Sequence, residues 1–83
     1  MMYKIQFTSK SEDQLKKLDR SVQERILVVL ERVKTRPYDF VKKLSGYKYF
    51  RLRVGDYRII IDINNEIMTI LIIEIGHRKN IYK

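Results

Sequence analysis

The stretch YFRLRVGDYRIIIDI, residues 49–63, decides the fold because apolar and polar residues alternate on both sides of a glycine. Alternation with a period of two is typical of a strand that buries one face. Gly55-Asp56, at the centre, is a turn signal of two-residue β-hairpins. The stretch therefore predicts two antiparallel strands joined by a tight turn.

The turn fixes which side chains lie opposite one another. With Gly55-Asp56 as the loop, Val54 pairs with Tyr57, and Arg53 faces Arg58. Successive side chains of a strand point to opposite faces of the sheet. One face of the hairpin is therefore apolar, and we expect helices to cover it. The other face collects the remaining side chains, which include Tyr49, Arg51, Arg53, Arg58 and Asp62.

The residues before the hairpin predict one strand and two helices. Residues 3–8 alternate as a half-buried strand does. Ser9 and Ser21 each have glutamate three residues later, and this capping-box pattern predicts two helix N-termini. The second helix must end before Pro37, because the residue preceding a proline is pushed out of the helical conformation. We expect residues 37–47 to be a connection.

The residues after the hairpin predict one further strand. Asn64-Asn65 is a second turn signal, and the apolar segment 66–75 follows it. The order β-α-α-β-β-β predicts an α+β fold, a single domain of residues 1–83. We expect a mainly antiparallel four-stranded sheet with a helical hairpin packed on one face. The last strand is apolar on both faces, as interior strands are, so the first strand is expected at the edge beside it.

Composition narrows the classes of function. The chain has no cysteine and one histidine, so we expect no disulfide framework, no protein-held metal centre and no cofactor. No signal-peptide pattern begins the sequence, and no window reaches the ~18 apolar residues of a membrane span, so the expected location is the cytoplasm. Eighteen Lys and Arg against ten Asp and Glu give a net charge of +8. Such a field attracts polyanions, nucleic acid above all, although solubility or the charged surface of a thermophile would also explain it.

The arginine-bearing side of the hairpin is hard to explain by folding alone. Like charges directly across two strands disfavour the sheet by up to roughly 1 kcal/mol per pair. A local rule broken without a gain in stability indicates a functional site. Phosphate would turn the repulsion into attraction, and the planar fork of arginine suits phosphate oxygens. The alternative is a set of solvated arginines, one of them neutralised by Asp62.

Two segments resemble signatures of the RelE/ParE toxin superfamily, in particular its RelE branch. YFRLRVGDYRII, residues 49–60, resembles the central signature. IGHRKNIY, residues 75–82, resembles the C-terminal signature of a glycine, a basic pair and a closing tyrosine. Residues 19–26 and the KLSG turn, residues 43–46, match in the family's order, so the resemblance covers essentially the whole chain. It implies the RelE-like fold and a type II toxin that cleaves mRNA in the ribosomal A site, through attack of a 2′-hydroxyl on the adjacent phosphate without a metal.

The resemblance also implies a role for each matching residue. Arg51 and Arg53 fall where RelE-like enzymes place basic residues on the active strand. Arg58 and Arg78 match the phosphate-contacting arginines, and Tyr82 matches the tyrosine near the scissile position. The best-known member has lysine at the first two of these positions. Because arginine keeps its proton in a protein, Arg51 and Arg53 should hold the phosphate and not serve as a base.

Acid–base chemistry must then come from other groups. The reaction needs a base for the 2′-hydroxyl and an acid for the departing 5′ oxygen. Tyr82 is the base candidate because surrounding cations favour a phenolate, and its alternative role is to cover the sheet edge or stack on a base. His77 is a further catalytic candidate; it points to the arginine side if the last strand keeps its alternation, which Gly76 could interrupt. Four lysines are expected either to contact ribosomal RNA or to be solvated surface: Lys42, Lys43, Lys48 and Lys79.

The implied partners are a RelB-like antitoxin and the ribosome with its mRNA and ribosomal RNA, and no membrane. The antitoxin would be partly disordered and acidic where it binds the basic surface. Two alternatives stay open. One is a ParE-like toxin that binds DNA gyrase and cleaves no RNA, which the arginine and tyrosine set as a unit argues against. The other is a non-catalytic module that binds RNA or docks an antitoxin.

Overall fold

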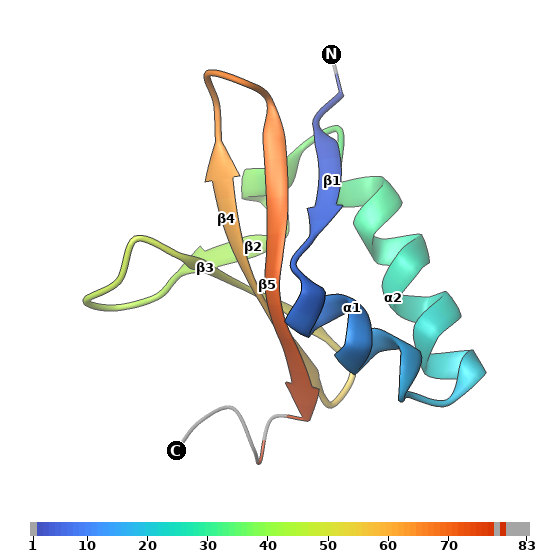
Figure 1. The fold of residues 1–83 in the computed structure, drawn as a ribbon. Coiled ribbons are helices and arrows are strands. Elements are labelled where there is room, and N and C mark those ends of the chain that lie inside the picture. The colour runs from blue at the N-terminus through green and yellow to red at the C-terminus, as the bar shows by residue number, and fades with distance from the viewer. Residues whose placement is uncertain (1, 78, 80–83) are drawn as a thin grey trace.

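The computed structural model describes residues 2–77 and Lys79 and contains two helices and a five-stranded sheet. The elements in chain order are β1 (Lys4–Phe7), α1 (Ser9–Lys16), α2 (Arg20–Val33), a 3-10 turn η1 (Pro37–Asp39), β2 (Val41–Lys43), β3 (Phe50–Val54), β4 (Tyr57–Asn64) and β5 (Thr69–His77). The sheet order is β1-β5-β4-β3-β2, with β1 parallel to β5 and all other neighbours antiparallel. Both helices lie on one side of the sheet (Figure 1). Within the described residues, no helix has the length and apolar character needed to cross a membrane.

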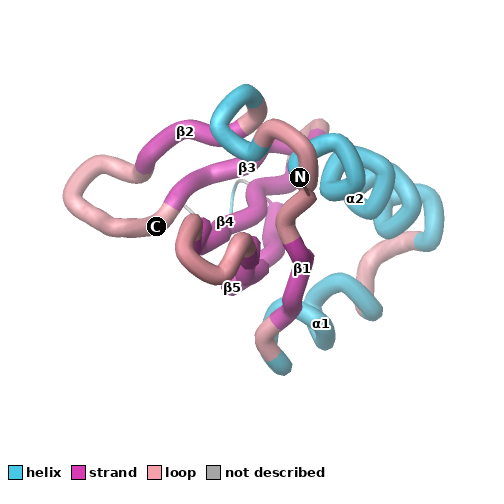
Figure 2. The backbone as a smooth tube through the Cα atoms, turned by 90° about the horizontal axis from the view of Figure 1, so that it is seen from above, coloured by secondary structure: helices cyan, strands magenta, loops and turns pink. Residues whose placement is uncertain are grey.

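The predicted α+β class, the hairpin register and the position of β1 beside β5 are all confirmed. The predicted number of four strands is wrong, because residues 37–47 contain β2 as well as η1. β2 is three residues long and pairs with β3 at the sheet edge, where the β2–β3 hairpin extends away from the helices (Figure 2). A strand of three residues is too short to produce a visible alternation, so the sequence pattern missed it.

The core lies between the helices and the helix-covered face of the sheet. α2 places Ile26, Leu30 and Val33 four and three residues apart, the spacing that aligns side chains along one helix face, and all three are buried. They belong to one apolar cluster with buried side chains of the sheet, which are Leu52, Val54, Ile59, Ile61, Ile70, Ile72 and Ile75. This cluster takes its members from α2, β3, β4 and β5, so it fixes the β3–β4 hairpin that carries the arginines.

The helices begin one or two residues earlier than the capping boxes predict. Thr8 is the N-cap of α1, and its hydroxyl accepts the N–H of Ser11 at 3.1 Å. Asp19 is the N-cap of α2 and makes no side-chain cap hydrogen bond. Thr8 ends the alternating strand pattern and also has the hydroxyl that a cap requires, so the sequence alone did not separate the two roles.

α1 continues the sheet edge where β1 stops. β1 ends at Phe7, whereas β5 continues to His77. The buried Ser11 donates from Oγ to the carbonyl oxygen of Ile72 at 2.7 Å, and the N–H of Ile75 donates to Oε1 of Gln14 at 2.7 Å. Backbone groups buried without hydrogen-bond partners are costly. These two side chains supply partners to the part of β5 that extends beyond β1.

A β-bulge in β5 changes which of its residues face the helices. Ile60 pairs with Glu74, but Ile61 pairs with Ile72, so Ile73 is an inserted residue without a partner in β4. Such an insertion shifts the alternation of the strand by one residue. Ile75 is buried in the core as a result, and Glu74 lies on the face that the helices leave uncovered.

The β4–β5 loop is longer than the sequence predicts. β5 begins at Thr69 and not at Glu66, because residues 65–68 form the turn. The Asn64 side chain caps that turn, since its Oδ1 accepts the N–H of Glu66 at 3.0 Å and that of Ile67 at 3.2 Å. The asparagine side chain binds backbone N–H groups that could otherwise pair with a neighbouring strand. β5 therefore begins later in the sequence than predicted.

Candidate nucleic-acid interface

Cationic side chains gather on the uncovered face of three neighbouring strands. Arg53 of β3 lies directly across from Arg58 of β4, as predicted, and Arg51 of β3 lies across from Lys42 of β2. Paired residues point to the same side of a sheet, and residues two apart on a strand also share a side. We call the surface made by Lys42, Arg51, Arg53 and Arg58 the arginine face.

The arginine face is compact enough to act on one phosphodiester. The Cβ atoms of directly paired residues are roughly 5 Å apart, and Arg51 and Arg53 are separated by roughly 7 Å along β3. Lys42 and Arg53 are exposed, whereas Arg51 and Arg58 are half-buried. The Nε of Arg53 donates to the carbonyl oxygen of Gly55 at 3.4 Å, a long and therefore weak bond.

Two carboxylates share this side of the sheet. Asp62 follows Ile60 by two residues on β4, and Glu74 pairs with Ile60 from β5. Glu74 forms an ion pair with Lys10 of α1, with 3.4 Å between its Oε1 and the lysine Nζ. The arginine face therefore has an acidic border on the β5 side, which limits the direction in which a polyanion can extend.

The sequence analysis did not place Lys42 at this site, and it did not identify Arg25 at all. Lys42 was expected to contact RNA, but its position opposite Arg51 depends on β2, which was not predicted. Arg25 of α2 reaches the β3–β4 turn, where its Nη1 lies 3.1 Å from the point that a Cβ on Gly55 would occupy. No sequence signal marks Arg25, because an arginine on the polar side of a helix is usually solvated surface.

His77 does not lie on the arginine face, because β5 does not keep the alternation on which that expectation depended. The bulge at Ile73 turns His77 to the same side as Tyr57, its cross-strand partner, and the two rings meet edge to face with centroids 5.5 Å apart. Its Nδ1 accepts the backbone N–H of Lys79 at 3.3 Å. The sequence held a clue: unbroken alternation from Ile72 would have placed Glu74 in the core.

The two remaining predicted catalytic residues, Arg78 and Tyr82, lie outside the described residues. The position across from Arg58 on β5 is Gly76. Arg53, Arg58 and Gly76 therefore lie side by side across β3, β4 and β5.

The lysines predicted to contact RNA do not form one continuous surface. Lys42 joins the arginine face, and Lys43, the next residue of β2, faces the other side with its Nζ 5.8 Å from the centre of the Phe50 ring. Lys48 lies in the β2–β3 loop, and Lys79 is exposed after the end of β5.

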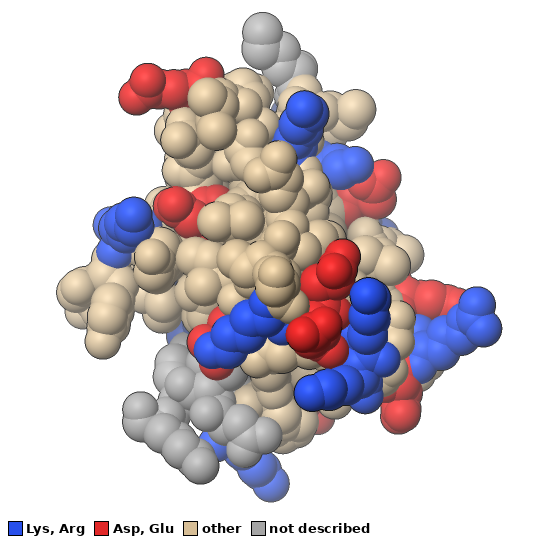
Figure 3. Space-filling view, viewed as in Figure 1, with Lys and Arg blue, Asp and Glu red and all other residues tan. Residues whose placement is uncertain are grey.

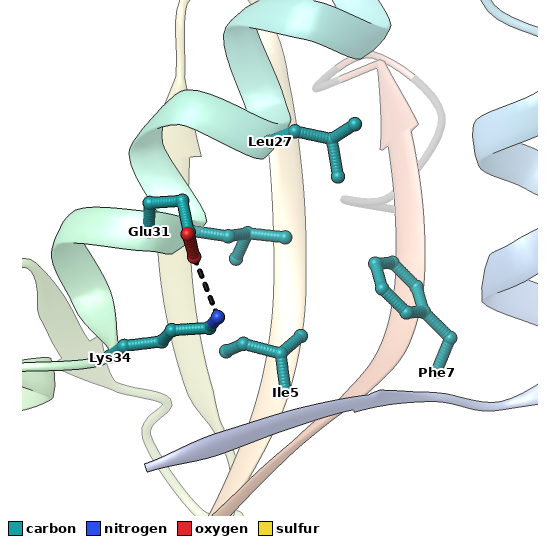
Figure 4. Close-up of a pocket in the computed structure, with 6 residues that line it drawn as sticks. Ile5, Phe7, Leu27, Glu31 and Lys34 are labelled. Atoms are coloured by element: carbon teal, nitrogen blue, oxygen red, sulfur yellow. Dashed lines mark ion pairs between the residues drawn. The ribbon is translucent and has the colours of Figure 1, made fainter. Parts of the chain in front are cut away.

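The helix side of the molecule offers a different kind of surface. A hollow of about 180 Å³ lies between β1 and α2 and is walled mainly by Ile5, Phe7 and Leu27 (Figure 4). At its rim, Nζ of Lys34 is 2.7 Å from Oε2 of Glu31. Basic and acidic side chains are interspersed over the helices (Figure 3), so this side lacks the single sign of charge found on the arginine face.

Comparison with known proteins assigns the chain to a family. A family model described as ParE toxin of type II toxin–antitoxin system, parDE, matches residues 5–82. This match takes in both helices, all five strands except the first residue of β1, and the whole arginine face. The chain belongs to this toxin family.

Similarity to individual proteins supports the same assignment. Toxin RelE3 of Methanocaldococcus jannaschii is 49% identical over 43 residues, a match that covers 51% of this chain and 47% of that relative, under half of its length. The RelE–RelB complex of Pyrococcus horikoshii contains a chain of the same fold, 26% identical with a TM-score of 0.82, over 96% of this chain and 99% of that one. The RelB–RelE complex of Methanococcus jannaschii is similar, at 31% identity and a TM-score of 0.75, over 94% of this chain and 95% of that one. This toxin has the RelE-like fold.

Proposed function

We propose that this toxin is a ribosome-dependent endoribonuclease that cuts mRNA in the A site. The observation that carries the proposal is the direct cross-strand pair of Arg53 and Arg58, with Arg51 beside it on the same face. These charges disfavour the sheet and attract phosphate, and the family is one of toxins. A surface that a fold maintains against its own electrostatics is best explained by its ligand.

In the proposed reaction, the 2′ oxygen of one nucleotide attacks the adjacent phosphorus. The bond from that phosphorus to the 5′ oxygen of the next nucleotide breaks. Negative charge accumulates on the phosphoryl oxygens as the new bond forms. Arg51, Arg53 and Arg58 would bind those oxygens and stabilise this charge, and donors of that kind each contribute about 2.7–4 kcal/mol in enzymes where one has been removed. The reaction needs no metal in this scheme.

Proton transfer is proposed for the C-terminal residues. Tyr82 would take the proton of the 2′-hydroxyl, and Arg78 would bind the phosphate from the β5 side. His77 packs on Tyr57 and accepts a hydrogen bond from Lys79, so we give it the task of positioning the residues that follow. The acid for the 5′ oxygen stays unassigned.

The ribosome would supply the alignment of the reacting groups, which the cationic surface does not provide. Arginines stabilise charge but do not place a 2′-hydroxyl in line with a phosphate. Holding reacting groups in attack geometry can lower a barrier by several kcal/mol, so a message fixed in the A site should react far faster than free RNA. Four lysines are proposed to contact ribosomal RNA: Lys42, Lys43, Lys48 and Lys79. The proposed place of action is the cytoplasm.

An antitoxin is the second proposed partner. The Pyrococcus and Methanococcus relatives were each solved as a complex with RelB, which supports a RelB-like partner for this chain. With a net charge of +8, this toxin should favour an acidic partner segment that folds as it binds. Covering the arginine face would block access to phosphate and silence the toxin.

The test is cleavage of a message on translating ribosomes, mapped by primer extension. We expect cuts within the A-site codon for the wild type, none on the same RNA without ribosomes, and a loss of at least a hundredfold for Arg58→Ala. Arg32→Ala is the matched control, because it removes an exposed arginine from α2 on the other side of the sheet. Equal cleavage by Arg58→Ala and the wild type would overturn the proposal.

A gyrase supercoiling assay run in parallel tests the second candidate. It is favoured by one observation, the description of the matching family model as ParE. Gyrase inhibition without RNA cleavage would assign this chain to that branch. Binding of antitoxin or RNA with neither activity, and no growth arrest on expression, would identify a non-catalytic module instead.

A further inference from the structure

The β2–β3 hairpin carries an exposed aromatic side chain at its tip that neither the core nor the arginine face explains. Tyr47, at the tip of the hairpin, is 67% exposed, and Tyr38 and Phe40, on the approach to β2, are 50% and 41% exposed. Exposing large aromatic rings forgoes the burial that such residues usually provide. A single exposed ring is ordinary, but Tyr47 stands at the tip of the projecting hairpin, two residues from the half-buried ring of Tyr49, and the two together indicate a binding surface.

The hairpin itself is rich in positive charge. Residues 40–55 contain five Lys or Arg and no Asp or Glu. Nζ of Lys48 lies 5.4 Å from the centre of the Tyr49 ring, and Nζ of Lys43 lies 5.8 Å from that of Phe50. Lysines on an edge strand also discourage pairing with other sheets, but that purpose does not require an exposed tyrosine at the tip.

The hairpin is continuous with the arginine face. Tyr49 lies directly before β3 and its carbonyl oxygen accepts the N–H of Leu44 at 3.0 Å, so the β2–β3 pairing continues to it and alternation puts it on the same side as Arg51. Along an extended strand, Tyr49 and Arg53 are roughly 13 Å apart. A nucleic-acid strand whose phosphate lies on Arg51 and Arg53 would thus place a neighbouring nucleotide over Tyr49 and the next toward Tyr47.

We infer that the β2–β3 hairpin is a stacking platform for unpaired bases of single-stranded RNA, with Tyr47 as its principal ring. This inference deepens the proposed nuclease function, on which it rests for the identity of the nucleic acid. Aromatic rings beside cations suit bases and phosphates together, and bases can reach such rings only when they are unpaired. An acidic protein segment fits less well, because its carboxylates would pair with the cations of the hairpin and would make no use of the exposed ring of Tyr47.

The experiment measures binding of a short 2′-O-methyl RNA oligomer, which cannot be cut because the attacking hydroxyl is blocked. Removing one stacking ring weakens binding by about 5- to 150-fold, the equivalent of 1–3 kcal/mol. We expect a loss in this range for Tyr47→Ala and recovery for Tyr47→Trp, since only the ring is required. Ile67→Ala is the matched control, because Ile67 is 66% exposed but lies in the β4–β5 loop.

Two further measurements separate stacking from charge. Tyr47→Ala should leave the slope of binding against salt unchanged, whereas Lys48→Ala should reduce that slope by about one counterion. On an oligomer that lacks its bases, wild type and Tyr47→Ala should bind equally. A Tyr47→Ala variant that binds the intact oligomer within twofold of wild type, or a wild type that does not bind it, overturns the inference.

The outcomes also distinguish this inference from the nuclease proposal. If messages are cut on the ribosome but Tyr47→Ala binds the oligomer normally, the platform is wrong and the nuclease stands. If the oligomer binds through Tyr47 but messages are not cut, the platform stands without the nuclease.

Discussion

The two faces of the β3–β4 hairpin are built from alternate residues of the same strands, yet they obey different rules. On the helix side, Leu52 and Ile59 pair with each other and are 1% and 0% exposed. On the other side, the adjacent pair is Arg53 with Arg58, two like charges. The first pair contributes to stability, and the second opposes it. The difference teaches that burial accounts for one face, whereas stability alone does not account for the other.

The largest expected effect tests the helix side. Ile59→Ala removes a fully buried side chain from the core cluster and should lower the free energy of unfolding by about 2–5 kcal/mol. Ile60→Ala is the matched control, since the neighbouring isoleucine is half-buried on the arginine side. We expect it to cost under about 1.5 kcal/mol. Urea denaturation followed by circular dichroism measures both, and equal losses would contradict the division into two faces.

The next effect tests the arginine side through activity. Arg58→Ala should reduce ribosome-dependent cleavage by about 10²–10³-fold, the loss typical of one transition-state donor. Its free energy of unfolding should change far less than that of Ile59→Ala. Single-turnover cleavage and urea denaturation of the same preparation separate the two quantities. A loss of cleavage fully accounted for by unfolding would place Arg58 with the core.

A smaller effect tests the turn that joins the two strands. Gly55 has a φ of +58°, a left-handed conformation that costs other residues about 1–2 kcal/mol, so Gly55→Ala should be destabilising by that amount. Gly46→Ala is the control, because Gly46 has a φ of +78° and open space around its Cβ position. Arg25 lies close to Gly55, so Gly55→Ala should cost slightly more. Thermal denaturation of the two variants measures the difference, and no loss at either site would contradict the turn geometry.

The smallest expected effect has the opposite sign. Arg53→Thr relieves the repulsion across from Arg58 and should raise the free energy of unfolding by up to about 1 kcal/mol. Added salt screens exposed charges, so the gain should shrink as ionic strength rises. Denaturation at low and high salt checks this expectation. A destabilised variant, or a gain that salt does not alter, would show that the like-charge pair does not strain the sheet.

Much of the candidate site was predictable because it lies within one hairpin. A two-residue turn fixes a register, and the register places Arg53 against Arg58 and Arg51 on the same face. Lys42 was not placed beside Arg51, because β2 is too short to show a pattern and forms only by pairing with β3. Arg25 was missed because its approach to Gly55 depends on how α2 crosses the sheet.

The position of His77 also depends on the tertiary structure. Alternation carried along β5 from Ile72 predicts His77 on the arginine face, but the bulge at Ile73 reverses the alternation. The bulge lets Ile75 enter the core while Glu74 pairs with Lys10 outside it. The reversal therefore follows from what packs best against the rest of the molecule.

The sequence by itself determined the class of the fold, the β3–β4 register and the gathering of three arginines on one face, because all of these follow from short-range periodicity and turn chemistry. The tertiary structure alone decided the bulge in β5, the replacement of β1 by α1 at the sheet edge, and the approach of Lys42 and Arg25 to the site. Each of these depends on contacts between residues far apart in the chain, whose geometry is set only when the core closes.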